Sequence, residues 1–242
     1  MLLLARGRQV PLDGIIDGLW GEQVPRAAVG TVRTYISRLR RLPAPGAGGQ
    51  ASELIESIGD GYALPHSAAG LDLDAFEQSV GDARLARRIH DTARARSLLR
   101  DALGLWRGSA LAGIPGPYAD SRRVRLAELH MAAVQDNLAM DIAVGEHGPA
   151  VAELRALLAE HPFREGLSGL LMLALYKSGR QAEALEVFDR VRRRLRAELG
   201  IDPGPALQAM HQRVLRADHR LMDRTAADPV HLLDAAVPAM VA

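Results

Sequence analysis

The chain has 242 residues, a length that suits one large domain or two ordinary ones. Its composition, 48% hydrophobic, 24% charged and 4% aromatic, is typical of soluble globular proteins and favours packing of helices on helices over a β-sandwich. The lack of cysteine excludes disulfides, thiolate metal sites and cysteine nucleophiles, and the sequence has neither a signal-peptide pattern nor an apolar run of about 20 residues that could span a membrane. We therefore expect a soluble, cytoplasmic protein.

The net charge of +1 hides a strongly basic segment near the start of the chain. Between Gln23 and Ser52 there is no acidic residue, whereas five arginines give the segment a charge of +5. These are Arg26, Arg33, Arg38, Arg40 and Arg41. Because local charge decides which partner a protein attracts more than total charge does, this segment is the first candidate for a binding surface.

A short helix is predicted within residues 9–20. Its apolar residues recur at the three- and four-residue spacing of one buried helical face. They are Leu12, Ile15, Ile16, Leu19 and Trp20. Asp13 is the expected N-cap of this helix, and Gly21 is the expected stop.

A second helix, predicted for residues 26–42, is the most informative element. Four apolar residues lie within a sector of about 80° on the helical wheel and predict a buried stripe: Val29, Val32, Ile36 and Leu39. The opposite face carries hydroxyl and arginine side chains: Thr31, Thr34, Ser37, Arg38 and Arg41. Arg33 and Arg40 flank one edge of the stripe, and Tyr35 flanks the other. Two short helices joined by a brief turn, the second basic on its outer face, are typical of a helix-turn-helix.

A β-hairpin is expected next. Residues 43–52 have the composition of a mobile loop, and two short strands are predicted at 54–58 and 62–64. The tract Gly59-Asp60-Gly61 supplies the positive φ angles that a tight hairpin needs. Helix, helix and hairpin follow in the order of a winged helix, and residues 65–70 are expected to form a linker.

From residue 71 onward the pattern is helical almost throughout. Helices are expected at 72–87, 91–106, 118–145, 148–160, 164–178, 180–199 and 203–217. Alanine pairs recur at 93/95, 150/152 and 182/184, and the last two pairs lie 32 residues apart, near the tetratricopeptide period of about 34. Small residues let paired helices approach closely, so we expect a repeat-built, all-helical domain. Residues 218–242 are expected to form a flexible tail.

The basic helix gives a hypothesis of DNA binding. Arginine releases counterions from phosphates and can also bond guanine bidentately. We expect Thr34, Ser37, Arg38 and Arg41 to face the major groove. We expect Arg33, Tyr35 and Arg40 to contact the backbone or flanking bases. The alternative is a solvated amphipathic helix, but the order of the elements favours DNA.

Other residues point to ordinary structural roles. The run Arg192-Arg193-Arg194-Leu195-Arg196 could touch DNA or RNA polymerase, although Asp189 and Glu198 at helical spacing favour a solvated, balanced face. Trp20 and Trp106 are expected in the core. The eight histidines show no metal-ligand spacing, and no catalytic constellation is present, so we expect no metal, no cofactor and no enzyme activity.

Several strings resemble a known family. Thr31-Val-Arg-Thr-Tyr-Ile-Ser-Arg-Leu-Arg-Arg, followed by Ile55-Glu-Ser-Ile-Gly-Asp-Gly-Tyr-Ala-Leu, resembles the end of an OmpR-type winged helix. Ala102-Leu-Gly-Leu-Trp-Arg-Gly-Ser-Ala-Leu, Met172-Leu-Ala-Leu-Tyr-Lys-Ser-Gly-Arg-Gln-Ala-Glu-Ala-Leu and Glu198-Leu-Gly-Ile-Asp-Pro-Gly-Pro-Ala-Leu are similar to segments of the bacterial transcriptional activator domain. Together they resemble the Streptomyces antibiotic regulatory protein family over residues 1–217.

The resemblance implies a mainly α fold: an OmpR-type winged helix over 1–65 and a tetratricopeptide-like bacterial transcriptional activator domain over 71–217. It also implies an activator of antibiotic or other secondary-metabolite genes that binds double-stranded DNA at direct repeats, as a homodimer, and recruits RNA polymerase. Compared with the family, the chain is expected to begin inside the first helix, without the N-terminal sheet. The wing tip at Gly59-Asp60 lacks the arginine common in OmpR-type wings, and no Gly-x-x-x-x-Gly-Lys loop is present to bind a nucleotide.

A different class of function stays open on these residues. Without the N-terminal sheet, the chain could be a helical-repeat module that binds proteins and does not bind DNA.

Overall fold

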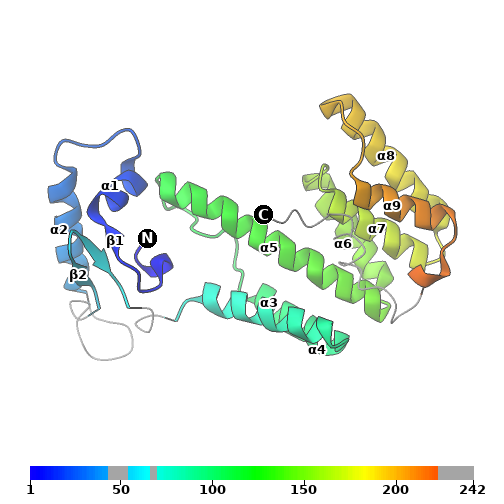
Figure 1. The fold of residues 1–242 in the computed structure, drawn as a ribbon, viewed down its shortest axis with the longest axis horizontal. Helices are drawn as coiled ribbons and strands as arrows, with labels where there is room; N and C mark the ends of the chain where they lie inside the picture. The colour runs from blue at the N-terminus through cyan, green and yellow to red at the C-terminus, as the bar shows by residue number, and fades with distance from the viewer. Residues whose placement is uncertain (43–53, 66–69, 223–242) are drawn as a thin grey trace, which may run out of the picture. The chain divides into compact units, whose positions relative to one another are not determined.

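The structure is a computed structural model, and it describes residues 1–42, 54–65 and 70–222 (Figure 1). The N-terminal elements are η1 (Leu3–Ala5), β1 (Val10–Pro11), α1 (Leu12–Trp20), α2 (Ala28–Arg40), β2 (Glu56–Ile58) and β3 (Gly61–Ala63). The helices that follow are α3 (Asp72–Arg88), α4 (Thr92–Gly104), α5 (Pro117–Val144), α6 (His147–Glu160), α7 (Glu165–Lys177), α8 (Gln181–Leu199), α9 (Pro205–Leu215) and η4 (His219–Leu221). The expected fold, a winged helix followed by an all-helical domain, is confirmed.

The chain divides into two compact units. The first contains residues 1–77 and 105–129, and the second contains residues 78–104 and those from 130 onward. Helices α3 and α5 therefore contribute residues to both units. The domain bounds predicted from the sequence, 1–65 and 71–217, are two continuous stretches, whereas each compact unit combines two separate stretches. These domain bounds stay a prediction.

A small antiparallel sheet closes the winged helix. The strand order is β1-β3-β2, with Val10 opposite Tyr62 and Ser57 opposite Tyr62 on the other side. Gly59 has a φ of +54°, as the predicted hairpin turn requires. Gly61 lets β1 approach, because a Cβ at this position would lie 2.3 Å from the carbonyl oxygen of Val10.

The core of the winged helix lies between α1, α2 and the hairpin. Its buried residues are Ile15, Ile16, Ala28, Val32, Ile36 and Ile55. The predicted stripe on α2 is therefore correct at Val32 and Ile36 but wrong at Val29 and Leu39, which are 41% and 44% exposed. Leu39 lies in the last turn of α2, beyond the residues that the core covers, whereas in the first turn the core covers Ala28 and leaves its neighbour Val29 exposed.

Two details of α1 also differ from the prediction. Leu19, expected in the core, is 38% exposed. The helix begins at Leu12, so Asp13 lies inside its first turn, where a carboxylate favours the helix dipole, and Pro11 occupies the N-cap position. Trp20 packs against the core as expected.

The first unit joins α1 closely to the segment that begins α5. Cβ atoms added at Gly18 and Gly21 would lie 3.2 Å from the Cβ of Tyr118 and 3.1 Å from the Cγ of Pro117, respectively. At Gly116, where φ is +108°, a Cβ would lie 3.0 Å from the carbonyl oxygen of Leu19. Glycines on both sides of this contact let the two backbones approach within van der Waals distance.

Two further contacts join residues distant in sequence within the same unit. The ring of Trp106 packs edge-on against Phe76, with centroids 5.3 Å apart, in line with the expected core role of this tryptophan. Arg6 forms ion pairs with Asp74, at 2.7 Å, and with Glu77.

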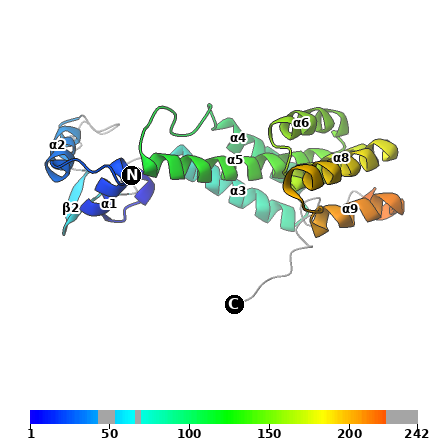
Figure 2. The ribbon, with the colours of Figure 1, turned by 90° about the horizontal axis from the view of Figure 1, so that it is seen from above.

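The regular elements that the structure describes in the second unit are all helices (Figure 2). Helix α7 packs against α6, α8 and α9 and is buried from Leu167 to Tyr176. In each predicted alanine pair one member is almost fully buried: Ala95, Ala150 and Ala184. Buried alanines at corresponding places allow the close helix packing on which the repeat prediction depends.

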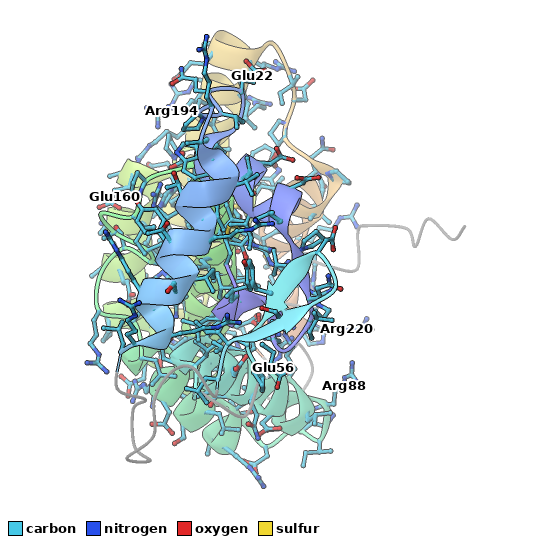
Figure 3. The ribbon with its side chains drawn as sticks, turned by 90° about the vertical axis from the view of Figure 1, so that its left-hand side faces the viewer. Glu22, Glu56, Arg88, Glu160, Arg194 and Arg220 are labelled. Carbon is cyan, nitrogen blue, oxygen red and sulfur yellow. The ribbon has the colours of Figure 1, made fainter. Side chains whose placement is uncertain are left out.

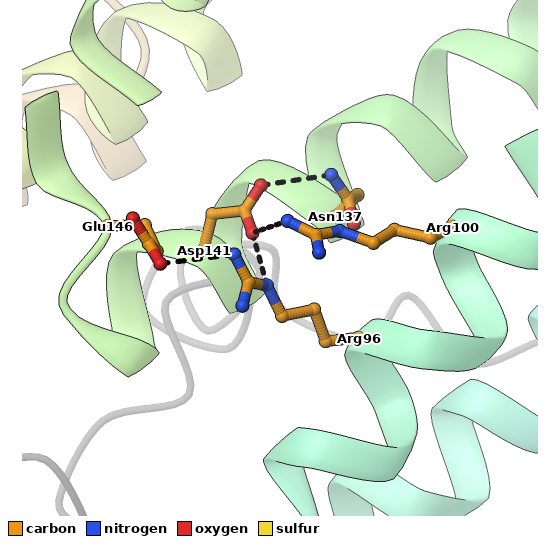
Figure 4. Close-up of polar contacts among 5 residues, drawn as sticks. All are labelled: Arg96, Arg100, Asn137, Asp141 and Glu146. Carbon is orange, nitrogen blue, oxygen red and sulfur yellow. Dashed lines mark hydrogen bonds and ion pairs between the residues drawn. The ribbon is translucent and has the colours of Figure 1, made fainter. Parts of the chain in front are cut away.

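Two buried aspartates attach α5 to the helices before it. Asp141 accepts hydrogen bonds from Arg96 Nε at 2.5 Å, Arg100 Nη2 at 3.3 Å and Asn137 Nδ2 at 3.1 Å (Figure 4). Asp136 accepts a bond from Arg87 Nη1 at 3.1 Å. Charged and polar partners satisfy these carboxylates, as burial requires.

Several of the predicted connecting segments fall outside the described residues. Residues 43–53, 66–69 and 223–242, which include the predicted loop and most of the predicted linker and tail, lie outside the described residues. At the start of that tail, η4 buries Leu221 completely, so residues 218–222 belong to the fold. No described helix is both long and apolar enough to cross a membrane.

Candidate nucleic-acid interface

Helix α2 separates an apolar face from a polar one. Ala28, Val32 and Ile36 are buried against the core. Six of the seven predicted DNA-binding residues are exposed: Arg33, Thr34, Tyr35, Ser37, Arg38 and Arg41. We call these six residues the outer face of α2. Figure 3 looks onto the side of the unit that carries α2 and the hairpin with Glu56.

The arginines of the outer face have no partner among the described residues. No ion pair or side-chain hydrogen bond joins Arg33, Arg38 or Arg41 to another residue of the described chain. Their cationic groups are therefore available to an anion from outside. Because each guanidinium presents several N–H donors in one plane, it suits a phosphate or a guanine edge.

Two hydroxyls on α2 are partly engaged by the helix itself. Thr31 Oγ1 donates to the carbonyl oxygen of Ala27 at 3.0 Å, and Thr34 Oγ1 donates to that of Gly30 at 2.8 Å. Their oxygens keep lone pairs that can accept a bond from a base amino group. Ser37 has no such bond to a described residue and can donate or accept.

Arg40, the seventh predicted residue, is oriented differently. It is half-buried, and its Nε and Nη2 donate to the carbonyl oxygen of Ile55 at 3.1 and 2.8 Å. Nη2 also donates to Ser57 Oγ at 2.9 Å, and the guanidinium lies 5.8 Å from the ring centre of Tyr62. The structure brings Arg40 onto the hairpin and leaves the other six predicted residues on the surface.

The hairpin itself offers no cation. Residues 54–64 contain Glu56 and Asp60 and neither lysine nor arginine. Gln9 Nε2 donates to the carbonyl oxygen of Ile58 at 2.7 Å and to Asp60 Oδ1 at 3.1 Å, so one side chain holds the turn from outside the hairpin. Sequence reasoning missed Gln9, and its 49-residue separation from Ile58 leaves no local pattern to detect it.

The second basic run, on α8, is engaged in ion pairs. Arg192 pairs with Asp189 at 3.4 Å, Arg194 with Glu198 at 3.0 Å and Arg196 with Asp202 at 2.7 Å. These exposed pairs favour the solvated, balanced face that the sequence suggested. Among the described residues, no three histidine, aspartate or glutamate side chains gather as a metal site.

Comparison with known proteins shows which family this chain is similar to. Residues 71–215 match the family model described as the bacterial transcriptional activator domain. "Regulatory protein AfsR" of Streptomyces coelicolor is 49% identical over 227 residues, which are 93% of this chain and 22% of that protein. "Regulatory protein DnrI" of Streptomyces peucetius is 35% identical over 223 residues, 90% of this chain and 82% of that protein.

A solved structure supports the same relationship. It is of Mycobacterium tuberculosis EmbR in complex with a low-affinity phosphopeptide, and it superposes with a TM-score of 0.84 at 31% identity. The match covers 97% of this chain and 61% of that one. The chain thus spans less than a quarter of AfsR and somewhat less than two thirds of the solved EmbR chain.

Proposed function

Because this chain belongs to the Streptomyces antibiotic regulatory protein family of transcriptional regulators, we propose that it binds double-stranded DNA through helix α2 and activates transcription. The observation that supports this function best is the outer face of α2. It presents three arginines, unpartnered within the part of the chain that the structure describes, beside exposed hydroxyls on a helix whose other face is fixed in the core. A helix held in this way can enter a major groove with its side chains ready to bond.

The residues of the outer face take different roles in this proposal. Arg38 and Arg41 donate to guanine edges, where a bidentate contact discriminates between bases. Thr34 and Ser37 accept or donate at neighbouring bases. Arg33 and Tyr35, closer to the edges of the buried stripe, contact the phosphate backbone and flanking bases, which sets register and orientation.

The remaining partners follow from the family. We propose that two copies bind direct repeats upstream of a promoter and that the helical domain contacts RNA polymerase. The genes that it activates would be those of an antibiotic or another secondary metabolite. In vitro transcription with purified RNA polymerase would test activation, because a protein that only binds DNA would occupy the promoter without raising transcript levels.

Charge reversal on the outer face tests the DNA contact. The double variant Arg38→Glu/Arg41→Glu is compared with Arg88→Glu/Arg94→Glu, which makes the same change in net charge at exposed sites on α3 and α4. Binding is measured by gel shift on fragments that the wild-type chain selects from random double-stranded DNA. We expect the α2 variant to lose at least about 100-fold in affinity, since each base contact is worth about tenfold or more.

Circular dichroism and thermal unfolding of both variants serve as the folding control. We expect both to melt like the wild type, because the replaced arginines are exposed. If the α2 variant keeps its affinity, or the α3/α4 variant loses as much, the assignment to α2 is wrong.

A helical-repeat module that binds proteins and no DNA is the second candidate. One observation favours it: the hairpin offers acidic residues where a DNA-contacting wing commonly carries a cation. In that case the wild-type chain would select no DNA sequence, and its weak binding would not respond to the exchange at Arg38 and Arg41.

A further inference from the structure

Arg40 lies where α2 meets the hairpin. Its side chain bridges α2 to Ile55, the buried residue just before β2, and to Ser57 within β2. It also lies over the ring of Tyr62, the residue of the central strand that pairs with both Val10 and Ser57. One side chain therefore contacts both strands of the hairpin from the last turn of the helix.

We propose that Arg40 is a positioning residue for DNA binding: it fixes the orientation of the last turns of α2 relative to the hairpin, and it does not itself contact DNA. This inference rests on the proposed function and replaces the direct contact that the sequence suggested for this arginine. Arg38 and Arg41 lie next to it in the same turns. Their positions in a groove therefore depend on how firmly this end of the helix is held.

The geometry requires a guanidinium. Two of its nitrogens converge on one carbonyl oxygen, and one of these also reaches a hydroxyl, so the planar fork makes three bonds at once. A lysine ammonium at this site could reach one of the two acceptors but could not span both while lying over the ring. A phosphate, in contrast, accepts either cation.

The difference between the two cations gives the experiment. Arg40→Lys is compared in the full chain with Arg33→Lys, a change at the exposed arginine that the proposed function places on the phosphate backbone. DNA affinity is measured on the selected fragments, and hydrogen exchange of the hairpin amides is measured in the protein without DNA. Ser57→Ala is added, because it removes one acceptor from Arg40 and leaves every arginine in place.

We expect Arg40→Lys to lower DNA affinity about tenfold, the usual effect of losing charge-assisted bonds. We also expect faster exchange in residues 55–63 and unchanged exchange in α6–α9. Arg33→Lys should leave hairpin exchange as in the wild type. Ser57→Ala should show a smaller effect in the same direction, and no added effect when combined with Arg40→Lys.

Three results would overturn the proposal. If Arg40→Lys keeps both affinity and exchange, the bonds do not position α2. If affinity falls while hairpin exchange stays unchanged, Arg40 acts on DNA directly. If exchange rises while affinity stays unchanged, the hairpin contact has no part in DNA binding. A wild-type chain that selects no DNA would instead refute the proposed function, whereas the exchange data would still report whether Arg40 fixes the hairpin.

Discussion

At the scale of single residues, Asp141 is a buried carboxylate with several polar partners in the second unit. Its side chain is 12% exposed and accepts bonds from two arginines of α4 and from Asn137 (Figure 4). Burying ions requires that each has a partner, and removal of one member leaves the others uncompensated. Removing the Asp141 carboxylate should therefore cost more stability than breaking an exposed ion pair of the same length.

We predict that Asp141→Ala lowers the free energy of unfolding by about 3 kcal/mol, the usual result of breaking a buried ion pair. Glu146→Ala is the matched control, because Glu146 is half-exposed and lies 3.7 Å from the same Arg96. This control should cost less than about 1 kcal/mol, as exposed pairs do. Urea titration followed by circular dichroism gives both values. Equal losses for the two variants would show that burial of Asp141 is not what matters.

His211 is a second residue whose environment has a measurable consequence. Its ring stacks on Phe188 with centroids 3.9 Å apart, and burial lowers the pKa of the imidazole, an effect that Asp189 opposes and Arg192 reinforces. The unfolded chain therefore binds a proton at this histidine more readily than the folded chain does. Linkage then requires stability to fall as the pH drops below the ordinary value of 6.5.

We predict that His211→Phe, which keeps a stacking ring without a titrating group, reduces the loss of thermal stability between pH 7.5 and pH 5.5. Replacement of the exposed His219 by glutamine is the comparison. Melting temperatures measured at both pH values decide the matter. An acid-induced drop as large in His211→Phe as in the wild type would contradict the role given to this ring.

At the scale of elements, the β1–β3 contact depends on the absence of a side chain at Gly61. A Cβ there would lie 2.3 Å from the Val10 carbonyl oxygen and 2.9 Å from the Cα of Pro11, both backbone atoms that cannot move aside. We predict that Gly61→Ala costs about 3 kcal/mol of stability, the upper end for overpacking, and weakens DNA binding with it. Gly81→Ala on α3, where no atom lies within 4 Å, should instead stabilise by about 0.5–1 kcal/mol. Chemical denaturation distinguishes the two, and a neutral Gly61→Ala would refute the close approach.

The helices of the second unit could be predicted because local signals mark them. Helix α8 was expected at 180–199 and runs from Gln181 to Leu199, with Gly179 and Gly200 in the left-handed region at its two ends. Glycine at such places and an amphipathic spacing between them are both visible in the sequence. The extent of burial was harder to predict. A helical wheel gives the direction of Leu39, but it does not show how far along α2 the covering elements reach.

Arg33 and Arg40 of the candidate interface also differ because of contacts that a helical wheel does not show. Arg33 and Arg40 lie only about 20° apart on the helical wheel, so spacing alone treats them alike. The structure separates them because Ile55 and Ser57 lie beside one and not the other. These acceptors are 15 and 17 residues away, across a segment whose path no local pattern predicts. The sequence thus predicts the side of the helix on which a residue lies, whereas the residue that it contacts depends on the fold.

At the scale of the whole molecule, total charge says little about the partner. The chain carries 30 basic and 29 acidic side chains, and many of the arginines outside α2 are held in ion pairs, as on α8. On the outer face of α2, three arginines without a partner among the described residues lie on one helix, in a segment that has no acidic residue between Gln23 and Ser52. Attraction to DNA should therefore come from a few local charges, and it should be correspondingly sensitive to salt.

The salt dependence of DNA binding measures how many charges take part. In the proposed roles Arg33 is the outer-face arginine that contacts a phosphate, so its one displaced counterion contributes a slope of about −0.9 for log K against log salt, or about 3.5-fold weaker binding per chain at 200 mM than at 50 mM. Arg33→Gln should bring the slope about 0.9 closer to zero. Arg193→Gln, within the basic run on α8, should leave the slope unchanged, because its neighbours are balanced by Asp189 and Glu198. If both variants changed the slope equally, α8 would share the DNA surface, and α2 alone would not account for binding.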